Sequence, residues 1–331
     1  MRIGSGEHTF EWIENWAVIP DTPESRADGR THGVVVTRDG RVIVLHLANP
    51  AILIFNAQGA LLDAWGDRFP GAHGLTLVEE RGTEYLWLTD YKTGEVVKTT
   101  LQGETVLSLP FPDFQGYNDP KYAPTWVSVF EERFGGNGDI WVADGYGAAY
   151  VHRYDRTGNY LSSLDGTTGA GRFRHPHGLY VDTRKTDPEL YIADRMNRRI
   201  QVYDLDGKFK RLGPDTVDTS ACAFIPYGEF TLIPEAPYRA RLTILDPHDH
   251  VVATLGENDQ ACARPGFPND RALVEPGRFV TPHSVAADAA GDIYVVEWIT
   301  GGRITKLAKP DLGNTGVIMD TTEAGTGTLK R

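Results

Sequence analysis

The sequence predicts an all-β protein, a six-bladed β-propeller with four strands in each blade. Two observations predict this fold. A short β-rich run, a polar turn and a second run ending in an acid recur along the chain, and no stretch longer than two turns has helical periodicity. Units of four short strands that repeat every ~40–50 residues are typical of propeller blades arranged around an axis.

Each predicted blade begins with the same motif or a variant of it. Four blocks open on a His-Gly or His-Ser pair, a fifth lacks the histidine but keeps the second run and its acid, and a sixth is degenerate. Asp-Gly, Asn-Gly or Gly-Asp turns separate their strands, as in β-hairpins. The blocks begin at His32, His73, Thr125, His177 and His283, and the degenerate copy runs from Cys222 to Leu255.

The last block ends near Lys309 with three strands, so the ring needs one more strand to close. The leading run His8 to Ile19 (HTFEWIENWAVI) is rich in aromatic residues and is predicted to supply it, the alternative being a frayed N-terminal arm. We expect residues 1–310 to form one propeller domain and residues 311–331, rich in Gly and Thr, to form a mobile tail.

Composition excludes several classes of protein. With 33 basic and 45 acidic residues the formal charge is −12, which argues against a nucleic-acid partner. Two cysteines cannot form a disulfide framework, and Cys222 and Cys262 are not expected to pair in a reducing cytosol. Because no apolar run approaches ~20 residues and the first residues lack a signal-peptide pattern, we expect a soluble cytoplasmic protein without a membrane partner.

Three histidines are the strongest candidates for chemistry. His73, His177 and His283 each stand at the start of a predicted innermost strand, and their spacings of 104 and 106 residues correspond to two blades each. Alternate blades of a six-bladed ring would therefore point three imidazoles at the axis. Three neutral imidazoles with an open fourth position are typical of a catalytic zinc site. Because protonated imidazoles cannot bind zinc, the zinc occupancy of the site is expected to fall as the pH drops through ~6.5.

An alternative interpretation is that the His-Gly pair recurs because it suits the bend of the chain. His32 favours this interpretation, since it repeats the motif outside the alternate set. The remaining histidines carry less information: His175 is a solvated turn residue or a group that supports the site, while His152, His248 and His250 are expected at the surface.

A second ring of candidates follows the second strand of each block. Acids at this position usually cap the next turn, so we expect them to be structural. Tyr146 and Arg195 suggest chemistry, because a phenol beside a metal can exchange a proton and a guanidinium can hold a developing oxyanion. The alternative is that Tyr146 packs against the next blade and Arg195 binds loop carbonyls.

At these residues the sequence resembles the NHL-repeat propellers, and in particular the catalytic core of peptidyl-α-hydroxyglycine α-amidating lyase. The resemblance covers Thr31 to Lys309 and is clearest in IWVADGYGAAYVHRYDRTGNYL, RHPHGLYVD, LYIADRMNRRIQVYDLDGKF and TPHSVAAD. It implies that His73, His177 and His283 bind zinc, that Tyr146 matches the family's catalytic tyrosine, and that Arg195 matches an arginine of an Asp-Arg pair.

Two positions depart from the family pattern. Leu47 follows His46 where the family has a catalytic arginine, which argues against amidating-lyase activity on glycine-extended peptides. Ser284 follows His283 where the family has an acid that serves a structural calcium, which argues against calcium as a cofactor. The resemblance thus implies that the zinc site is retained while the groups that recognise substrate have changed.

The sequence leaves three functions open. The first is a zinc-dependent lyase-type enzyme acting on a small hydroxylated, carbonyl or peptide-like substrate, with the metal as Lewis acid and Tyr146 as the proton-transfer group. The second is a non-catalytic propeller that binds a protein, peptide or sugar. The third is a metal-dependent hydrolase, of which a calcium-dependent lactonase is disfavoured because it needs inward carboxylates rather than histidines.

Overall fold

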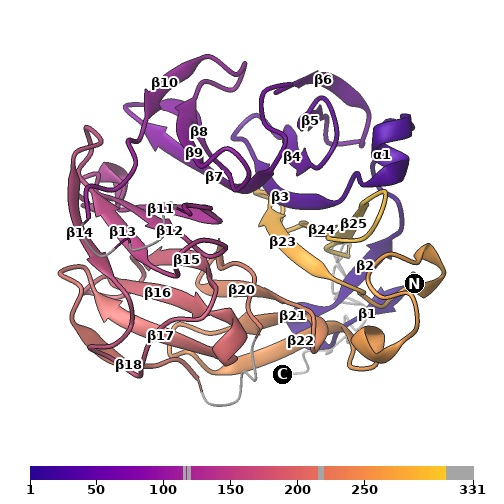
Figure 1. Ribbon diagram of the computed structural model, residues 1–331. Coiled ribbons are helices and arrows are strands. Elements are labelled where there is room, and N and C mark those ends of the chain that lie inside the picture. The colour runs from indigo at the N-terminus through magenta and orange to yellow at the C-terminus, as the bar shows by residue number, and fades with distance from the viewer. Residues whose placement is uncertain (115–116, 118–120, 215–219, 311–331) are drawn as a thin grey trace, which may run out of the picture.

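The computed structural model describes residues 1–114, 117, 121–214 and 220–310, and these form six antiparallel sheets arranged around one axis (Figure 1). This confirms the predicted all-β, six-bladed propeller. The expected tail at residues 311–331 lies outside the described residues. No helix in the described ranges is long and apolar enough to span a bilayer.

The strands of each blade follow one another from the axis outward. The innermost strands are β3 (Thr31–Val36), β7 (Ala72–Glu80), β11 (Trp126–Val129), β15 (Pro176–Asp182), β19 (Ile225–Tyr227) and β23 (Pro282–Ala287). The second strands are β4 (Val42–His46), β8 (Thr83–Asp90), β12 (Ile140–Ala143), β16 (Glu189–Asp194), β20 (Phe230–Glu235) and β24 (Ile293–Glu297).

The outer half of each blade carries its most exposed strands. The third strands are β5 (Ile52–Phe55), β9 (Glu95–Thr99), β13 (Val151–Tyr154), β17 (Arg199–Asp204), β21 (Ala240–Leu245) and β25 (Arg303–Ala308). The fourth strands are β6 (Leu61–Trp65), β10 (Thr105–Ser108), β14 (Tyr160–Leu164), β18 (Phe209–Leu212) and β22 (Val251–Asn258), and β2 (Phe10–Ile13) for the last blade.

The N-terminal run closes the ring, as predicted. Strand β2 pairs antiparallel with β25, Trp12 lying opposite Leu307, and the short β1 (Arg2–Ile3) adds a fifth strand outside it (Figure 1). Arg303 stabilises this junction, because its guanidinium is fully buried and bonds Glu297 of β24 and Glu14 beyond β2. The two ends of the described chain therefore share one sheet.

Helices are short and lie in the connections. They are α1 (Pro23–Ala27) and the 3-10 turns η1 (Gly6–His8), η2 (Glu132–Phe134), η3 (Arg195–Asn197), η4 (Ala261–Ala263) and η5 (Arg271–Leu273). Helix α1 begins where the Thr22 side chain accepts from the Ser25 N–H, with Pro23 at the first helical position.

The hydrophobic core is divided into clusters between neighbouring blades. One cluster joins each adjacent pair around the ring, for example Leu45 and Leu75 between the first two blades and Phe279 and Leu242 between the last two. Because stability is distributed over six such clusters, a polar substitution at the axis leaves most of the buried apolar area intact.

A candidate metal centre on the propeller axis

Four buried histidines occupy the same place in four blades, the second position of the innermost strand. They are His32, His73, His177 and His283 in β3, β7, β15 and β23. At each of them the pairing with the second strand shifts register. An irregularity of this kind re-aims a side chain, and here imidazoles from different sides of the ring come together at the axis.

Three of these imidazoles are held by the neighbouring blade. The Nδ1 atoms of His73, His177 and His283 lie 2.9, 2.7 and 2.8 Å from the backbone carbonyl oxygens of Thr125, Cys222 and His32. Each carbonyl accepts a hydrogen bond, so Nδ1 carries the proton and Nε2 keeps its lone pair. In metal-binding histidines, the ring nitrogen that does not bind the metal usually donates to a carbonyl or carboxylate, and this bond fixes the orientation of the ring.

The glycine after two of these histidines explains why the pair is His-Gly. A Cβ atom added at Gly74 would lie 2.5 Å from the Thr125 oxygen, and one at Gly178 would lie 2.6 Å from the Cys222 oxygen. These are the carbonyls that His73 and His177 bond. The motif therefore does suit the chain path, as the alternative interpretation held, and the same close approach fixes the imidazoles.

The structure brings all three predicted metal residues together. The ring centres of His73, His177 and His283 are 4.8 to 4.9 Å apart in every pair. His32 joins the cluster at 4.6 Å from His73 and 4.7 Å from His283, and the donor atoms of these three lie within 4.8 Å of one another. The alternate-blade spacing predicted His73, His177 and His283, whereas the group of donor atoms that lie together contains His32 and not His177.

Tyr146 reaches the same cluster from the loop after β12. Its hydroxyl oxygen lies 3.0 Å from His73 Nε2 and 3.2 Å from His177 Nε2. The loop is fixed because Asp144 accepts the N–H groups of Ala123 and Ala148, while the Tyr146 N–H donates to the Ala123 carbonyl. Burial raises the pKa of Tyr146, and Arg195 opposes that rise, so the phenol keeps its proton at neutral pH.

Arg195 places a positive charge beside the imidazoles. It begins η3 directly after β16, and its Nε donates to the Ala236 carbonyl at 3.3 Å. Its charge helps to lower the pKa of His73, His177 and His283. The same charge opposes the rise in the pKa of Tyr146. Within the described ranges no carboxylate forms an ion pair with Arg195, so its charge is available to an anionic group.

Residues at matching positions of three other blades surround this site. The Tyr91 ring lies 6.0 Å from His73 and 5.5 Å from Tyr146, and the Trp298 ring lies 6.5 Å from His32. Leu47 is partly buried, and its N–H donates to the Arg30 carbonyl two residues before His32. Tyr91, Tyr146 and Trp298, which follow the second strands of three blades in the predicted ring of candidates, thus lie beside the histidines.

The acids of that ring are structural, as predicted. Asp90, Asp144, Asp194 and Glu297 accept backbone N–H groups of Gly71, Ala123, Arg174 and Val280, each in the segment leading into the innermost strand of its own blade. These bonds satisfy buried donors and hold the start of each blade.

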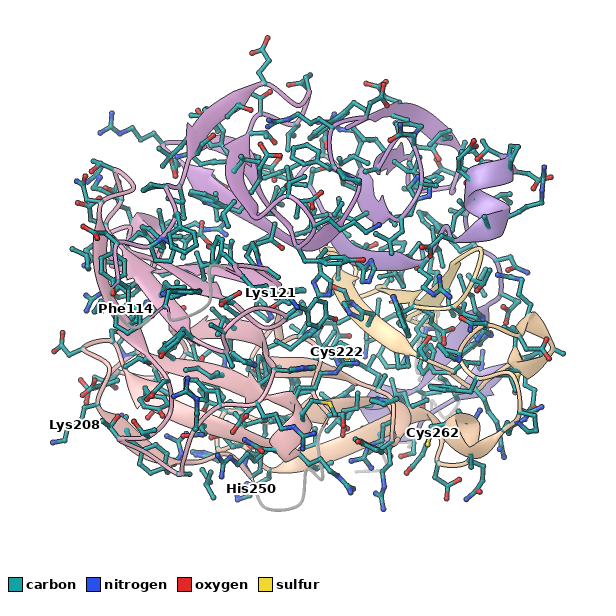
Figure 2. All side chains as sticks on the ribbon, viewed as in Figure 1. Phe114, Lys121, Lys208, Cys222, His250 and Cys262 are labelled. Carbon is teal, nitrogen blue, oxygen red and sulfur yellow. The ribbon has the colours of Figure 1, made fainter. Side chains whose placement is uncertain are left out.

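His152 lies in a buried network, so the prediction of a surface position for it was wrong. Its Nε2 lies 3.0 Å from the Tyr117 hydroxyl, which donates to Asp144 Oδ2 at 2.5 Å, and its Nδ1 lies 2.7 Å from Ser163 Oγ. Strand alternation did not reveal this because the Tyr117 side chain, from a different segment, covers that face. His248 and His250 are exposed, as expected, and so is His175. Figure 2 shows His250 at the rim of the molecule.

Acid is expected to destabilise the protein partly through His152. Burial lowers the pKa of His152 to about 3, whereas an unfolded histidine has a pKa of about 6.5. Between these values the unfolded state binds the proton and the native state does not, so stability falls as the pH falls. Urea unfolding should show the natural protein losing about 2 kcal/mol more than His152→Gln between pH 7 and pH 5. Equal losses would contradict the assigned burial.

The three carbonyl-bonded histidines fit a bound zinc ion. Burial, aided by Arg195, lowers the pKa of His73 to about 3 and those of His177 and His283 well below the ordinary range. The imidazoles are therefore neutral, as zinc ligands must be. Protons are therefore expected to displace zinc only at pH values well below ~6.5, the pKa of an unperturbed histidine.

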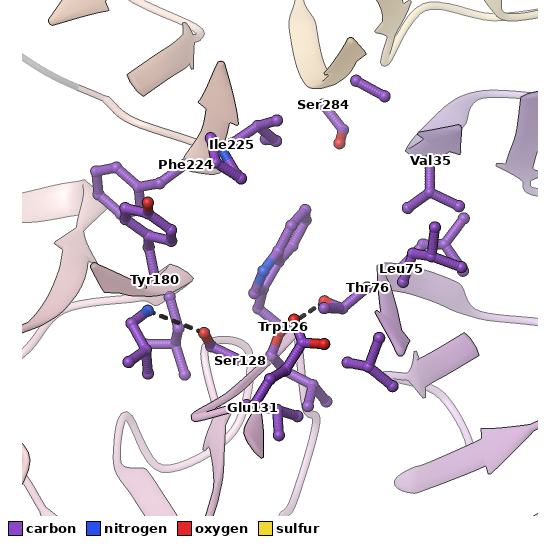
Figure 3. Close-up of a pocket in the computed structure, with 18 of the residues that line it drawn as sticks. Val35, Leu75, Thr76, Trp126, Ser128, Glu131, Tyr180, Phe224, Ile225 and Ser284 are labelled. Carbon is purple, nitrogen blue, oxygen red and sulfur yellow. Dashed lines mark hydrogen bonds between the residues drawn. The ribbon is translucent and has the colours of Figure 1, made fainter. Parts of the chain in front are cut away.

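A cavity of about 410 Å³ lies between the innermost strands of the six blades (Figure 3). Apolar side chains from all six blades line it: Val35, Leu75, Trp126, Leu179, Phe224 and Val285. The Ser284 hydroxyl points into the cavity, while the Thr76 and Ser128 hydroxyls bond backbone groups. Ser284 stands where the family resemblance has an acid, so the wall lacks at this position the carboxylate that calcium favours as a ligand.

The two cysteines do not pair. Cys222 is buried near the centre of the ring, and Cys262 lies farther out (Figure 2). Cys222 acts instead through its backbone carbonyl, which orients His177.

Fold and site together define a six-bladed propeller with a histidine cluster on its axis, and comparisons agree with the resemblance to NHL-repeat proteins. No family model matches the chain. Human NHL repeat-containing protein 3 is 25% identical over 266 residues, covering 75% of this chain and 70% of that protein. Peptidyl-alpha-hydroxyglycine alpha-amidating lyase 1 of Drosophila melanogaster is 30% identical over 284 residues, covering 77% of this chain and 48% of the lyase. A probable lyase of the same name from Caenorhabditis elegans is 25% identical over 229 residues, 58% of this chain and 63% of that protein.

Solved structures share the fold at low identity. A streptogramin B lyase superimposes with a TM-score of 0.61 at 14% identity, covering 91% of this chain and 98% of that one. A gluconolactonase from Xanthomonas campestris gives a TM-score of 0.62 at 12% identity, covering 93% and 95%. These likenesses show the propeller architecture.

Proposed function

We propose that this protein is a zinc-dependent lyase-type enzyme that acts on a small hydroxylated or carbonyl substrate at the centre of the propeller. One observation carries the proposal: His73, His177 and His283 donate through Nδ1 to backbone carbonyls, and the Tyr146 hydroxyl lies 3.0 and 3.2 Å from Nε2 of two of them. This combines three neutral nitrogen donors with a proton-transfer group.

His73, His177 and His283 would hold the zinc ion through Nε2. A bound zinc ion would supply Lewis-acid polarisation of a substrate hydroxyl or carbonyl oxygen. The protein's own part is to keep the imidazoles neutral by burial and to orient them through the Thr125, Cys222 and His32 carbonyls.

Tyr146 and Arg195 are the proposed catalytic residues. When a carbinol is cleaved, its O–H proton is lost, a C=O bond forms, the bond to the leaving group breaks and the leaving group gains a proton. Tyr146, protonated because burial raises its pKa, would give its phenolic proton to the leaving group and take the carbinol O–H proton in its place. Arg195, which lies beside Tyr146 without an acidic partner in the described chain, would stabilise negative charge on the substrate oxygen.

The relatives support an enzyme and also the second candidate. Two of them are named as amidating lyases, which act on peptidyl-alpha-hydroxyglycine. Human NHL repeat-containing protein 3 is named for its repeat alone, which keeps a non-catalytic binding propeller in consideration. A metal-dependent hydrolase would use the same histidines, and incorporation of labelled oxygen from water into the product would distinguish it from a lyase.

Metal content tests the proposal most cheaply. Protein purified without added metal should contain about one zinc ion per chain by elemental analysis, since three-histidine sites bind zinc. A chelator should remove it, and added zinc at a hundred times its dissociation constant should stabilise the stripped protein by about 2.7 kcal/mol. Stripped protein that neither rebinds zinc nor gains stability would favour the binding propeller.

Leu47 is expected to influence how much charge the substrate can carry. An arginine there would add a fixed charge beside the cluster, whereas leucine adds apolar surface, so we expect a less charged substrate. α-Hydroxyglycine-extended peptides should give little or no turnover with the zinc-loaded natural protein. Turnover of these peptides at ~10 s⁻¹, an ordinary rate for an enzyme, would show that Leu47 does not set this specificity.

A further inference from the structure

His32 differs from the other three histidines in how its ring is held. Its imidazole is 2% exposed, and its Nδ1 has no hydrogen-bond partner in the described structure. Its backbone carbonyl already accepts the His283 Nδ1–H, so that role does not depend on its side chain. An unpartnered buried nitrogen is costly, and each one in a native structure calls for an explanation.

The surroundings of His32 point to a ligand. Its ring lies against His73 and His283 on one side and the Trp298 ring on another, with Arg30 stacked over Trp298 at 5.0 Å. None of these neighbours makes a hydrogen bond to His32 Nδ1 in the described structure. The other two blades whose carbonyls support a histidine have Thr125 and Cys222 at the matching position, so blade packing alone does not require an imidazole there.

We propose that His32 is a fourth ligand of the metal ion, an inference that rests on the proposed function. The donor atoms of His32, His73 and His283 lie within 4.8 Å of one another. Imidazole nitrogens at about 2.0–2.1 Å from one tetrahedral ion are about 3.4 Å apart, so small side-chain rotations bring them into range. With His177 the set has four nitrogens, and a substrate oxygen would bind such an ion as a fifth ligand, since zinc sites can expand to five-coordinate during reaction.

The test measures metal binding rather than activity. The chelator-stripped full-length protein is titrated with Co²⁺ against a competing chelator, and the visible spectrum of bound Co²⁺ is recorded. His32→Ala keeps the carbonyl that orients His283, and His32→Gln keeps most of the side-chain volume if the alanine variant folds poorly. His46→Ala is the matched control, because His46 is a buried histidine of the same blade whose Nε2 bonds the Pro50 carbonyl.

Both His32 variants should still bind one Co²⁺ but at least about tenfold more weakly, with a shifted Co²⁺ spectrum, while His46→Ala matches the natural protein. Unchanged affinity and spectrum in the His32 variants would overturn the fourth ligand and leave the three-histidine site standing. Failure of the natural protein to bind Co²⁺ would overturn both the inference and the proposed function.

Discussion

Replacing His177 by alanine is expected to abolish stoichiometric zinc binding while leaving the propeller folded. His177 is fully buried, its Nδ1 donates to Cys222 and its Nε2 faces the cluster. His177 is one of the three histidines that a backbone carbonyl orients, so its loss is expected to weaken zinc binding far more than the loss of His32, whose Nδ1 has no partner in the described structure. The variant also leaves the Cys222 carbonyl without its donor, at a cost of about 1–3 kcal/mol.

The fold should survive this loss because His177 belongs to none of the apolar clusters that join neighbouring blades. Elemental analysis measures the zinc, and circular dichroism with thermal melting measures the fold. His46→Ala serves as the control, since it removes a buried imidazole outside the cluster. Zinc content that is unchanged in a folded His177→Ala protein would rule out His177 as a ligand.

Tyr146→Phe and Arg195→Ala are each expected to lower turnover by ~10²–10³ while zinc is retained. The phenylalanine keeps the ring packing against His73, 5.0 Å between centres, and removes only the hydroxyl that lies 3.0 Å from Nε2. The Arg195 variant removes the unpaired positive charge beside the imidazoles. Neither residue is a metal ligand in this account, so the two variants separate catalysis from metal binding.

Turnover would be measured on whichever compound of a carbinol and carbonyl panel the zinc-loaded natural protein consumes. Tyr91→Phe is the control, because the Tyr91 ring also lies close to His73 and Tyr146 but its hydroxyl makes no bond to the histidines. If Tyr146→Phe keeps turnover close to that of the control, proton transfer by this phenol is excluded.

The repeat made most of the fold and much of the candidate site predictable. Residues at equal positions of a repeat lie at equal positions around the axis, so the two-blade spacing of His73, His177 and His283 was enough to predict that they meet. The same argument grouped Tyr146 and Arg195, because both follow a second strand. Closure by β2 followed from the missing strand of the last blade.

The remainder depends on contacts that a repeat pattern does not encode. The repeat left the role of His32 open because this residue lies outside the alternation, yet its ring lies beside His73 and His283. His152 was expected at the surface because nothing in its strand indicates that Tyr117 covers it. The carbonyl partners of the histidines are backbone atoms of other blades, and their identity required the packed ring.

A crystal structure of the natural protein with data collected above and below the zinc absorption edge tests the central claim most directly. The account predicts one anomalous peak on the propeller axis, bound at about 2.0–2.1 Å by Nε2 of His73, His177 and His283. A peak located away from these histidines, or an empty cluster in crystals grown with excess zinc, would contradict it.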